Sequence, residues 1–420
     1  MIKVGIIGVG TVGQSVVDIL QKNKDIISAR SGVDIVPTIG AVRSLDKKRE
    51  VDIKLTDNPE EVINSDVDIV VELMGGVDEP FKYVSKALEN GKSVVTANKA
   101  LLAYHRYELQ ELAGDLPLFY EASVAGGIPI IGALRNGLSA NHIESIVGIL
   151  NGTCNYMLTK MIQEGVNYNE VLKEAQELGY AEADPTFDVG GFDAAHKLLI
   201  LASIAYGIDA KPEDILIEGI DNISQTDVEF AKEFGYEIKL LGIAKKKDKG
   251  VELRVHPTMV KDNHPIAKVD GVMNAVSVVG DRVGQTMFYG PGAGGDATAS
   301  AVVADIIEIA RGNRGPMLGY KRGLEGEKLK LLNAKDIVTK YYIKLKVEDK
   351  SGVLAKVTNV FSENGISISS ILQKPSKIQD RVRLLLTTHE CKERDFISVV
   401  TKLKTLDCVE ENLGFIRIEE

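Results

Sequence analysis

In the first third of the chain, short apolar runs alternate with stretches of helical periodicity. The opening run 2–7 is almost wholly apolar, and glycines and then apolar positions at Val16, Val17 and Leu20 follow it. This pattern predicts a buried strand that leads into an amphipathic helix. The alternation continues through predicted strands at 34–41, 68–73, 93–96 and 118–121 and a predicted helix at 80–90. Strands that alternate with helices predict a doubly wound parallel sheet of the α/β class.

The middle of the chain follows a different pattern, in which several strands come together before the next helix. We predict helices at 153–164 and 169–178, a third from Phe192, a fourth at 298–310, and strands at 142–150, 238–244, 251–257, 275–279 and 286–289. Such an order is typical of an α+β substrate domain. Its strands carry more apolar alternation than its few helices would cover, which predicts at least a homodimer.

The last part of the chain reads as a module of its own. Residues 316–340 are charged and only weakly periodic, which predicts a linker. Beyond them, strand and helix patterns follow in the order βαββαβ, typical of a ferredoxin-like fold. We therefore predict an N-terminal domain at 1–135, completed by a helix at 297–315, a substrate domain at 136–296, the linker at 316–340 and a C-terminal domain at 341–420.

A glycine motif lies between the first strand and the first helix. Gly8, Gly10, Thr11, Val12 and Gly13 belong to a GxGxxG sequence in the context that dinucleotide binding requires. The glycines permit a tight turn, close approach of a pyrophosphate and close helix packing, and the phosphate would lie at the helix N-terminus. The motif predicts a Rossmann domain that binds NAD or NADP; an ordinary turn with chance glycines is the alternative.

The end of the second strand bears on the choice between NAD and NADP. An acidic residue there would bind the ribose 2'-hydroxyl of NAD, but the sequence reads Ala41-Val42-Arg43. Arg43, with the basic residues at 47–49, favours the 2'-phosphate of NADP, and a solvated basic loop is the alternative. Several cations could also hold NADP too firmly for release, which would leave NAD as the working oxidant.

The stretch 179–197 contains the strongest candidate chemistry. It holds several carboxylates and one lysine, and Asp193 and Lys197 share a helix face at i,i+4 spacing. Such a pair is commonly a solvated surface pair. However, the helix after Lys197 is almost wholly apolar through Ala205, which predicts that the lysine lies at the edge of a buried element with a pKa set by burial and nearby carboxylates. Such a site suits a small zwitterionic or cationic substrate.

Two further segments are candidates for the nicotinamide end of the cofactor. Lys99 follows a predicted strand end, where ligands of such sheets bind, but a surface lysine at a helix start fits equally. The glycine loop 290–296 opens the predicted helix at 298–310, and either cofactor contact or plain helix capping explains it.

Composition narrows the classes of protein. The net charge of -10 and the pI near 5.3 argue against binding to nucleic acid or to an anionic membrane surface. No apolar run approaches the roughly 20 residues of a membrane span, and the chain enters a strand without a signal peptide, so we expect a cytoplasmic protein with no membrane partner. The three cysteines have neither metal spacing nor a disulfide pattern, and Cys154 is expected to be a packed residue rather than a nucleophile.

Taken together, these motifs resemble those of the homoserine dehydrogenase family. The matching sequences are the GxGxxG, Glu-Ala-Ser-Val-Ala-Gly-Gly-Ile-Pro at 121–129, Asn-Gly-Thr at 151–153, Gly-Tyr-Ala-Glu-x-Asp-Pro at 179–185 with Asp-x-x-x-Lys at 193–197, and Gly-x-Gly-Ala-Gly at 290–294. The resemblance covers about residues 1–315. It implies reversible reduction of L-aspartate 4-semialdehyde to L-homoserine with NAD(P), in the biosynthesis of threonine, methionine and isoleucine.

The resemblance also implies roles for particular residues. Lys197 would be the proton donor and acceptor, and Glu182, Asp193 and Thr153 would bind substrate. Gly179, Gly294 and Lys99 would lie near the nicotinamide. A monovalent cation, usually Na⁺, would be held by Glu121 and the carbonyl groups of Val124, Gly126 and Ile128, since oxygen ligands suit a hard cation.

Residues 349–364 resemble the start of an ACT module, a small-molecule sensor of amino-acid biosynthesis enzymes. We expect an allosteric amino-acid effector, with threonine favoured and methionine or isoleucine as rivals, bound between paired modules near the turn 351–354. A dimerisation tail without a ligand is the alternative. We expect the single-function form, without an aspartokinase region. Two other functions stay open: another amino- or hydroxy-acid dehydrogenase, or a non-catalytic sensor that binds nucleotide and amino acid.

Overall fold

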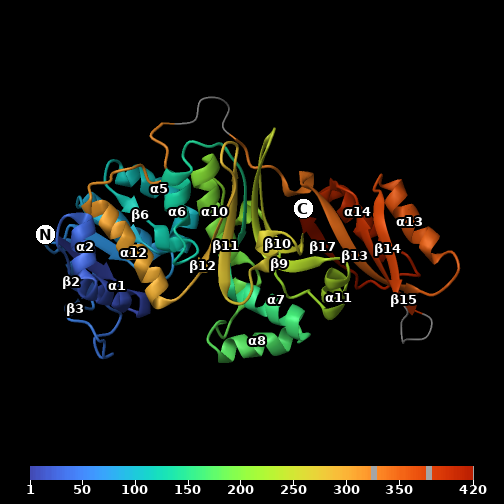
Figure 1. Ribbon diagram of the computed structural model, residues 1–420, viewed down its shortest axis with the longest axis horizontal. Coiled ribbons are helices and arrows are strands. Elements are labelled where there is room, and N and C mark those ends of the chain that lie inside the picture. Colours follow the sequence, from blue (N-terminus) through green and yellow to red (C-terminus); the bar gives the residue numbers. More distant parts are fainter. Residues whose placement is uncertain (323–328, 375–380, 420) are drawn as a thin grey trace.

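The computed structural model describes residues 1–322, 329–374 and 381–419. Three regions follow one another along the long axis: an N-terminal α/β unit, a central sheet with helices, and the C-terminal βαββαβ unit at the far end (Figure 1). Part of the predicted linker, residues 323–328, lies outside the described residues. Among the helices of the described residues, none is both long and apolar enough to cross a membrane.

The N-terminal unit is the predicted doubly wound sheet. Its strands are arranged in the order β3-β2-β1-β4-β5-β6, and all neighbours are parallel. The strands are β1 (Ile2–Ile7), β2 (Ile35–Ala41), β3 (Lys54–Thr56), β4 (Ile69–Glu72), β5 (Ser93–Thr96) and β6 (Leu118–Phe119). The helices are α1 (Thr11–Lys22), α2 (Lys24–Ser31), α3 (Pro59–Asn64), α4 (Asp78–Glu89) and α5 (Lys99–Ala113). The predicted strands are confirmed, whereas β3, α2 and α3 are too short to leave a clear period in the sequence.

A helix from far along the chain returns to this unit. Helix α12 (Gly295–Ala310) packs Val302 and Ile306 into the same core as Val4 and Ile6 of β1. At its N-terminus, a Cβ on Gly295 would lie 3.1 Å from the Ser15 hydroxyl oxygen, so α12 and α1 begin side by side. The helix predicted at 298–310 therefore exists and begins at Gly295.

The connection to the central region is built from short helical turns rather than from one long helix. It consists of a 3-10 turn (η1, Glu121–Ser123), a short α6 (Ile130–Gly132) and a π-helical turn (η2, Ala133–Gly137). The central strands are β7 (Ile143–Ile149), β9 (Tyr236–Lys247), β10 (Gly250–Lys261), β11 (Met273–Gly280) and β12 (Gly284–Pro291), with a two-residue strand β8 (Leu216–Ile217) paired to β10. The central helices are α7 (Gly152–Glu164), α8 (Tyr168–Glu177), α9 (Thr186–Val189), α10 (Phe192–Tyr206) and α11 (Gln225–Glu233).

Helix α10 lies at the centre of the molecule (Figure 1). Its residues are apolar on nearly every side, and those from Asp193 to Ile204 are all buried. A helix that is hydrophobic all round must be covered all round, and α10 contacts α5 of the first unit as well as β9 and β10 of the central sheet. The helix therefore presents whatever polar groups it carries to the boundary between the two regions.

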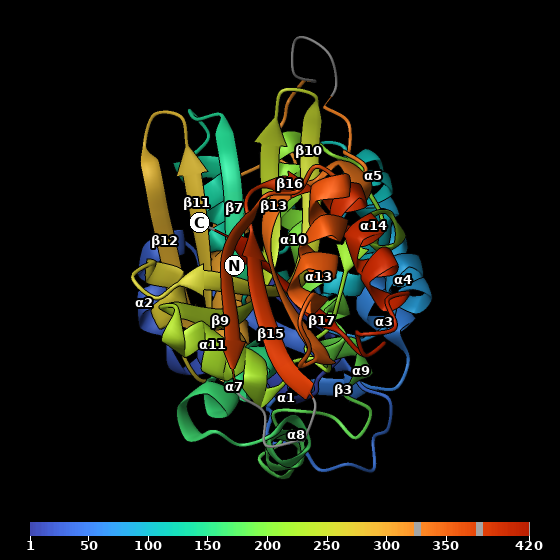
Figure 2. The ribbon, with the colours of Figure 1, turned by 90° about the vertical axis from the view of Figure 1, so that its right-hand side faces the viewer.

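The C-terminal unit is less separate than its sequence suggested. Its elements are β13 (Val338–Glu348), α13 (Val353–Glu363), β14 (Ile368–Lys374), β15 (Arg381–Thr388), β16 (Cys391–Lys392), α14 (Glu393–Lys404) and β17 (Gly414–Glu419). Strand β17 pairs in parallel with β10, matching Thr258 with Arg417 and Val260 with Glu419. One sheet in the order β12-β11-β7-β9-β10-β17-β13-β15-β14 thus runs through both regions (Figures 1 and 2).

The two faces of β13 show how closely the regions are joined. Tyr341 packs into the core of the C-terminal unit with Phe361 and Phe396, under α13 and α14. Tyr342, on the opposite face, stacks on Phe230 of α11 with ring centroids 4.2 Å apart. Side-chain alternation predicts that a strand has two faces, but it does not identify the partner of each face. The C-terminal unit is consequently part of the central core and not an isolated module.

Candidate active site

The candidate site is built around Asp193 at the start of α10. The carboxylate is 1 % exposed. One oxygen, Oδ2, accepts hydrogen bonds from Lys197 Nζ at 2.7 Å and from Asn151 Nδ2 at 2.8 Å. The other oxygen, Oδ1, lies 2.5 Å from Lys99 Nζ. The solvated surface pair considered from the sequence is therefore wrong, because Asp193 and Lys197 form a buried cluster with a lysine from the N-terminal unit.

Burial and charge set the ionisation of this cluster. Burial lowers the pKa of Lys197, and the attraction of Asp193 opposes that effect without cancelling it. Burial alone would raise the pKa of Asp193, but Lys197 and Lys99 outweigh it and hold the pKa below its ordinary value. The predicted influence of burial on Lys197 is confirmed. The cluster thus holds a carboxylate beside an amine that gives up its proton more readily than an ordinary lysine.

The carbonyl oxygen of Leu150 helps to fix the position of Lys197. Its Nζ donates a second hydrogen bond to the carbonyl oxygen of Leu150 at 2.7 Å, and Asn274 Nδ2 donates to the same oxygen at 3.2 Å. A Cβ on Gly292 would overlap the Asn274 amide, at 2.1 Å from its carbon. The glycine loop 290–295 therefore packs directly behind the groups that surround Lys197, which plain helix capping would not require.

Asn151 is a residue whose role the sequence did not identify. Its Oδ1 accepts from the amide of Cys154 and caps α7, while its Nδ2 donates to both Asp193 and Asp188 at 2.8 Å. Burial raises the pKa of Asp188, and the neighbouring charge of Asp193 raises it further. One amide thus bridges two carboxylates that repel each other. Asparagine is a common helix cap, so the sequence gave no sign of this second function.

The other predicted substrate residues are placed differently. Thr153, in the first turn of α7, donates its hydroxyl to the carbonyl of Tyr180 at 2.6 Å and so ties the loop 179–184 to that helix. Glu182 lies exposed in this loop, and its main-chain carbonyl accepts a hydrogen bond from the Gln176 side chain. Gly179 has a φ of +75°, which starts the loop in a conformation that favours glycine.

The glycine motif fits a dinucleotide at each of its three glycines. Gly8 has a φ of +104°, and a Cβ there would lie 2.7 Å from the carbonyl oxygen of Leu73. A Cβ on Gly13 would lie 2.4 Å from the Gly8 carbonyl oxygen, whereas Gly10 faces open space. Helix α1 has no side-chain cap and no acidic residue in its first turn. Thr11 and Val12 therefore open a helix whose free amides suit a phosphate.

The two arginines of the basic loop after β2 differ in their exposure and in their contacts. Arg43 is exposed, as are Lys47 and Lys48. Arg49 instead donates Nε to the carbonyl of Val9 at 2.9 Å and Nη1 to the carbonyl of Ser44 at 2.9 Å, so it braces the glycine loop. The basic loop is thus only partly a solvated one.

The predicted cation ligands lie in the connection between the first two regions. Glu121 is buried; its two oxygens accept from the amides of Ile131 and Gly132, and its own amide donates to buried Asp305. Burial raises the pKa of both carboxyl groups, and the charge of Glu121 raises the pKa of Asp305 further. A cation between them would relieve this cost.

The backbone beside these acids is unusual. Ala125 has a φ of +55°, and it is the one non-glycine residue in the described part of the chain with a positive φ. Gly126, which follows, has a φ of +50°. These two left-handed residues lie among the carbonyl groups that the family resemblance implies as ligands, and such strain is concentrated at functional sites.

A buried acid in the N-terminal unit supports the start of α5, the helix that carries Lys99. Glu72, at the end of β4, accepts from the Thr96 hydroxyl and from the Met74 amide, both at 2.6 Å. The Thr96 hydroxyl oxygen accepts from the amide of Asn98, and Asn98 caps α5, whose first residue is Lys99. Burial raises the pKa of Glu72 to about 7. The sequence showed Glu72 only as part of a strand, because its partners lie on other segments.

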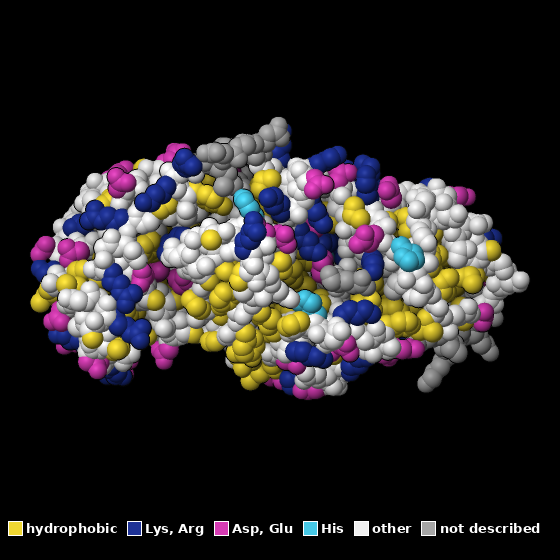
Figure 3. All heavy atoms as spheres, turned by 45° about the horizontal axis from the view of Figure 1, so that its top comes forward, with side chains coloured by type: hydrophobic (Ala, Val, Ile, Leu, Met, Phe, Trp, Pro, Cys, Tyr) yellow, Lys and Arg dark blue, Asp and Glu magenta, His cyan; other side chains and the backbone are white. Residues whose placement is uncertain are grey.

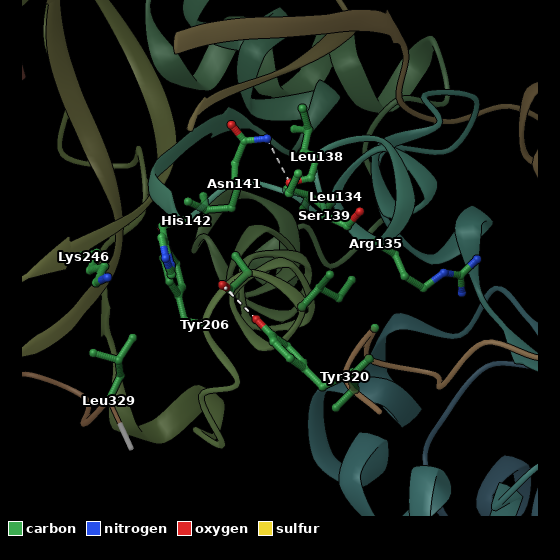
Figure 4. Close-up of a pocket in the computed structure, with 16 residues that line it drawn as sticks. Leu134, Arg135, Leu138, Ser139, Asn141, His142, Tyr206, Lys246, Tyr320 and Leu329 are labelled. Carbon is green, nitrogen blue, oxygen red and sulfur yellow. Dashed lines mark hydrogen bonds between the residues drawn. The ribbon is translucent and has the colours of Figure 1, made fainter. Parts of the chain in front are cut away.

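Two other features lie outside the reactive cluster. Cys154 is buried, its thiol contacts the carbonyl of Asp188, and burial raises its pKa well above the ordinary value, which supports the packed role expected for it. A cavity of about 220 Å³ lies at the far end of α10, where Tyr320 Oη donates to the Ala205 carbonyl (Figure 4). Lys197 lies two turns away from Ala205 on that helix, so this cavity does not belong to the cluster.

Comparison with known proteins gives one enzyme family for the N-terminal and central regions and a separate domain family for the C-terminal region. Residues 129–307 match the family model described as homoserine dehydrogenase, and residues 8–116 match its NAD binding domain. Residues 341–408 match the ACT domain. The chain is 50% identical over 419 residues to the homoserine dehydrogenase of Helicobacter pylori, covering 100% of this chain and 99% of that relative.

Solved structures agree with these matches. A homoserine dehydrogenase from Thiobacillus denitrificans has a TM-score of 0.95 and 43% identity, covering 100% of this chain and 98% of that one. A hyperthermophilic archaeal homoserine dehydrogenase, described as a complex with NADPH, has a TM-score of 0.63 and 29% identity, covering 73% of this chain and 97% of that one.

The buried position of Glu72 yields a prediction about pH. Its folded pKa of about 7 lies above the value of roughly 4.3 in an unfolded chain. The stability that a raised pKa implies is present below pH 4.3 and is lost as the pH rises through 7. Glu72→Gln does not titrate, so between pH 4.5 and 8 the wild type should lose about 3 kcal/mol of unfolding free energy relative to this variant.

Urea unfolding of both proteins across that range measures the difference. Glu89→Gln, at an exposed position on α4, is the matched control and should leave the difference flat within about 0.5 kcal/mol. A flat difference for Glu72→Gln as well would contradict the raised pKa.

Proposed function

The chain belongs to the homoserine dehydrogenase family, and from that premise we propose how its own residues carry out the NAD(P)-dependent interconversion of L-aspartate 4-semialdehyde and L-homoserine. The single observation that carries the proposal is the buried Lys197 amine, which is held between Asp193 and the Leu150 carbonyl. A lysine in such surroundings has the means to exchange a proton at neutral or mildly alkaline pH.

NAD(P) supplies or accepts the hydride when it is bound. During reduction, Lys197 donates a proton to the oxygen that develops negative charge at C4 of the semialdehyde. During oxidation, the neutral Lys197 amine takes the proton from the homoserine hydroxyl. Asp193 and the Leu150 carbonyl orient the amine. Lys99 forms an ion pair with the other oxygen of Asp193, at the border with the cofactor domain. Lys99 and Gly294 would thereby contact the nicotinamide end.

The substrate residues follow from charge and exposure. Glu182 is exposed and offers its carboxylate to the substrate ammonium. Thr153 acts through the loop that carries Glu182, since its hydroxyl is engaged by Tyr180. For Asp193 to bind substrate directly, its Oδ1 would exchange Lys99 for the ammonium group. Gly179, where the loop begins, lets the backbone approach the nicotinamide.

Replacement of Lys197 tests the proton route. Lys197→Ala should lower kcat for homoserine oxidation by about 10²- to 10⁴-fold, the usual contribution of a positioned general base. In the wild type, the oxidation rate should rise with pH through the Lys197 pKa, below the roughly 10.4 of free lysine, because burial lowers that pKa. The rise should vanish in the variant. Lys173→Ala, a change at an exposed position on α8, is the control. Near-normal turnover in Lys197→Ala would contradict the role of Lys197 in proton transfer.

We propose that NADP is the preferred dinucleotide. Support comes from the exposed Arg43 at the end of β2, from the absence of an acid there, and from the NADPH complex of the archaeal relative. A 2'-phosphate would meet Arg43 with Lys47 or Lys48 beside it. The same charges could retain NADP so firmly that NAD becomes the faster oxidant.

Arg43→Asp tests this preference. Loss of a charge-assisted hydrogen bond of about 1.5–3 kcal/mol should raise KM for NADP by roughly 10- to 150-fold and leave KM for NAD within a few fold. Lys54→Asp, on the neighbouring strand β3, is the control. Equal effects on KM for NADP and KM for NAD would show that Arg43 is only a charged loop residue and does not bind the 2'-phosphate. If kcat with NAD exceeds kcat with NADP in the wild type and Arg43→Asp removes the difference, tight retention is the reason.

We also propose a monovalent cation, with Na⁺ favoured, at Glu121 and the carbonyls of Val124, Gly126 and Ile128. The buried acids Glu121 and Asp305 and the strained Ala125 support it. The cation would fix the connection that joins the cofactor and substrate domains. Activity that is unchanged when choline replaces sodium and potassium in the buffer would count against it.

The predicted homodimer, or a higher homo-oligomer, would form on the outer face of the central sheet. Val147, Met273 and Met287 are only partly buried there, and Tyr289 on β12 is 58% exposed. Hydrophobic side chains gather across the middle of the face shown in Figure 3. Sedimentation as a monomer at micromolar concentration would rule the dimer out.

Finally, we propose that the ACT unit binds an amino-acid end product, with threonine favoured over methionine and isoleucine, and tunes catalysis. Support comes from the family match of residues 341–408 and from the continuous sheet that joins this unit to the catalytic part. The sequence points to the turn 351–354 between paired modules as one position for the effector; rates that are unaffected by millimolar threonine, methionine and isoleucine would count against regulation.

A further inference from the structure

The segments that follow β4 and β5 are joined by a closed hydrogen-bond ring. Glu72 accepts from the Met74 amide at Oε1 and from the Thr96 hydroxyl at Oε2, both at 2.6 Å. The Thr96 hydroxyl oxygen accepts from the Asn98 amide at 3.0 Å, and Asn98 Nδ2 donates to the Gly76 carbonyl at 2.9 Å. The main chain from Gly76 back to Met74 closes the hydrogen-bond ring.

This hydrogen-bond ring borders the crevice in which a dinucleotide would lie. Ligands of doubly wound sheets bind at the carboxyl ends of the strands, where β1, β4 and β5 end together. Gly8 of the glycine motif packs here, since its Cβ would lie 2.7 Å from the Leu73 carbonyl oxygen. Gly75 and Gly76 are exposed, and a Cβ on either would meet no atom of the described residues within 4 Å. The segment 74–76 is therefore a wall with open space beside it.

The other part of the hydrogen-bond ring carries Lys99. Asn98 Oδ1 accepts from the Leu101 amide at 3.0 Å and so caps α5, which begins at Lys99. Lys99 in turn pairs with Asp193 of the reactive cluster. One buried carboxylate, that of Glu72, thus fixes both the wall 74–76 and the start of α5 at the same end of the sheet.

The hydrogen-bond ring requires an ionised Glu72. Both carboxylate oxygens accept, and the Thr96 hydroxyl gives its only proton to Glu72 while its oxygen accepts from Asn98. A protonated carboxyl group is itself a donor, which would face either the Met74 amide or the Thr96 hydroxyl. In either case one proton of the ring loses its acceptor, which is costly in a buried place.

We propose that Glu72 is a positioning residue for the nicotinamide end of the cofactor and acts through the wall 74–76 and the start of α5; the inference rests on the NAD(P)-dependent reaction proposed above. The nicotinamide group meets a correctly placed wall only when the hydrogen-bond ring is complete. The adenosine half of the cofactor would lie beyond the ring, at the basic loop after β2, and should not depend on it.

The ionisation of Glu72 gives this role a direction with pH. Burial raises the pKa of Glu72 to about 7, and hydrogen bonds from Thr96, Met74 and Asn98 oppose that effect. The hydrogen-bond ring is therefore complete above pH 7 and interrupted below it. Because the folded pKa is raised, the free energy of unfolding falls as the pH rises through 7. Affinity for the nicotinamide end should rise over the same range, whereas a carboxylate with a purely structural role would weaken binding and fold together.

The other charged and titratable side chains in the first two turns of α4 and α5 are exposed or have partners. On α4, Asp78, Glu79 and Lys82 are exposed, and Lys82 lies over the Tyr83 ring; on α5, Lys99 pairs with Asp193, Tyr104 with Glu213, His105 with Glu108 and Arg106 with Ser203. In the sheet, β1 and β5 place Ile7 and Thr96 beside Glu72. Histidine is the side chain that ordinarily titrates near neutrality, so His105 supplies a control.

The affinities of two ligands test the proposal in the full chain. NADP and 2'-phospho-ADP-ribose differ in the nicotinamide group, so the ionisation of their shared phosphates cancels in the ratio of their Kd values. Calorimetry from about pH 5.5 to 8.5 should show that the wild type gains a preference for NADP of roughly 5- to 50-fold as the pH rises through 7. The free energy of unfolding, measured in urea, should fall over the same range.

Three variants locate the effect in the hydrogen-bond ring. Glu72→Gln resembles the protonated carboxyl group in shape and charge, because its amide nitrogen is a donor, and it should keep the low-pH ratio at every pH. Thr96→Ser retains the hydroxyl and should show the rise of the wild type. Thr96→Val removes the hydroxyl and should stay at the low ratio. The Thr96 pair carries the test if Glu72→Gln does not fold, and His105→Gln should behave like the wild type.

The outcomes separate this inference from the proposed reaction. A ratio that rises with pH in Glu72→Gln as it does in the wild type would overturn the inference, as would a flat ratio in the wild type. A preference for NADP that falls together with the free energy of unfolding would show that Glu72 is only structural. Homoserine turnover with a flat ratio would contradict the role of Glu72 alone. The expected ratios without homoserine turnover would support that role and contradict the proposed reaction.

Discussion

The charge of one buried carboxylate holds the active site together. Asp193 is nearly inaccessible to water, yet it stays ionised because lysines approach it from two different units of the protein. Lys197 belongs to its own helix, and Lys99 opens the helix that follows β5. If either cation were removed, the remaining charges would be left partly uncompensated in a desolvated place, which is expensive. The cluster therefore fixes the cofactor domain against the substrate domain and tunes the proton-carrying amine at the same time.

Much of this arrangement was readable from local sequence. The strand, glycines and helix at the N-terminus, and the i,i+4 spacing of Asp193 and Lys197, are relations between near neighbours, and both were confirmed. The contact between Lys99 and Asp193 spans the two domains, and the spacing of residues along the sequence does not predict it. The same holds for Asn151, whose two carboxylate partners come from a later loop and helix, and for Glu72, which depends on a neighbouring strand.

The relation between the ACT unit and the enzyme was misjudged for a related reason. Periodicity in 341–420 gave the right elements and therefore suggested a self-contained module. The pairing of β17 with β10, and the stack of Tyr342 on Phe230, depend on which strand edge and which face find a partner. Those are properties of the assembled sheet. The domain bounds and the roles of individual site residues stay predictions, since contacts alone do not assign a function.

The shared sheet also has a consequence for protein synthesis. The stretch Thr258–Val260 of β10 is covered by β17, and roughly 150 residues separate Lys261 from Gly414. At about 5–20 residues per second, a ribosome needs on the order of 10–30 s to make that interval. During this time the nascent catalytic region exposes an unpaired strand edge, the kind of surface on which aggregation begins. Chaperones would have most to protect in the interval before the last strand leaves the ribosome.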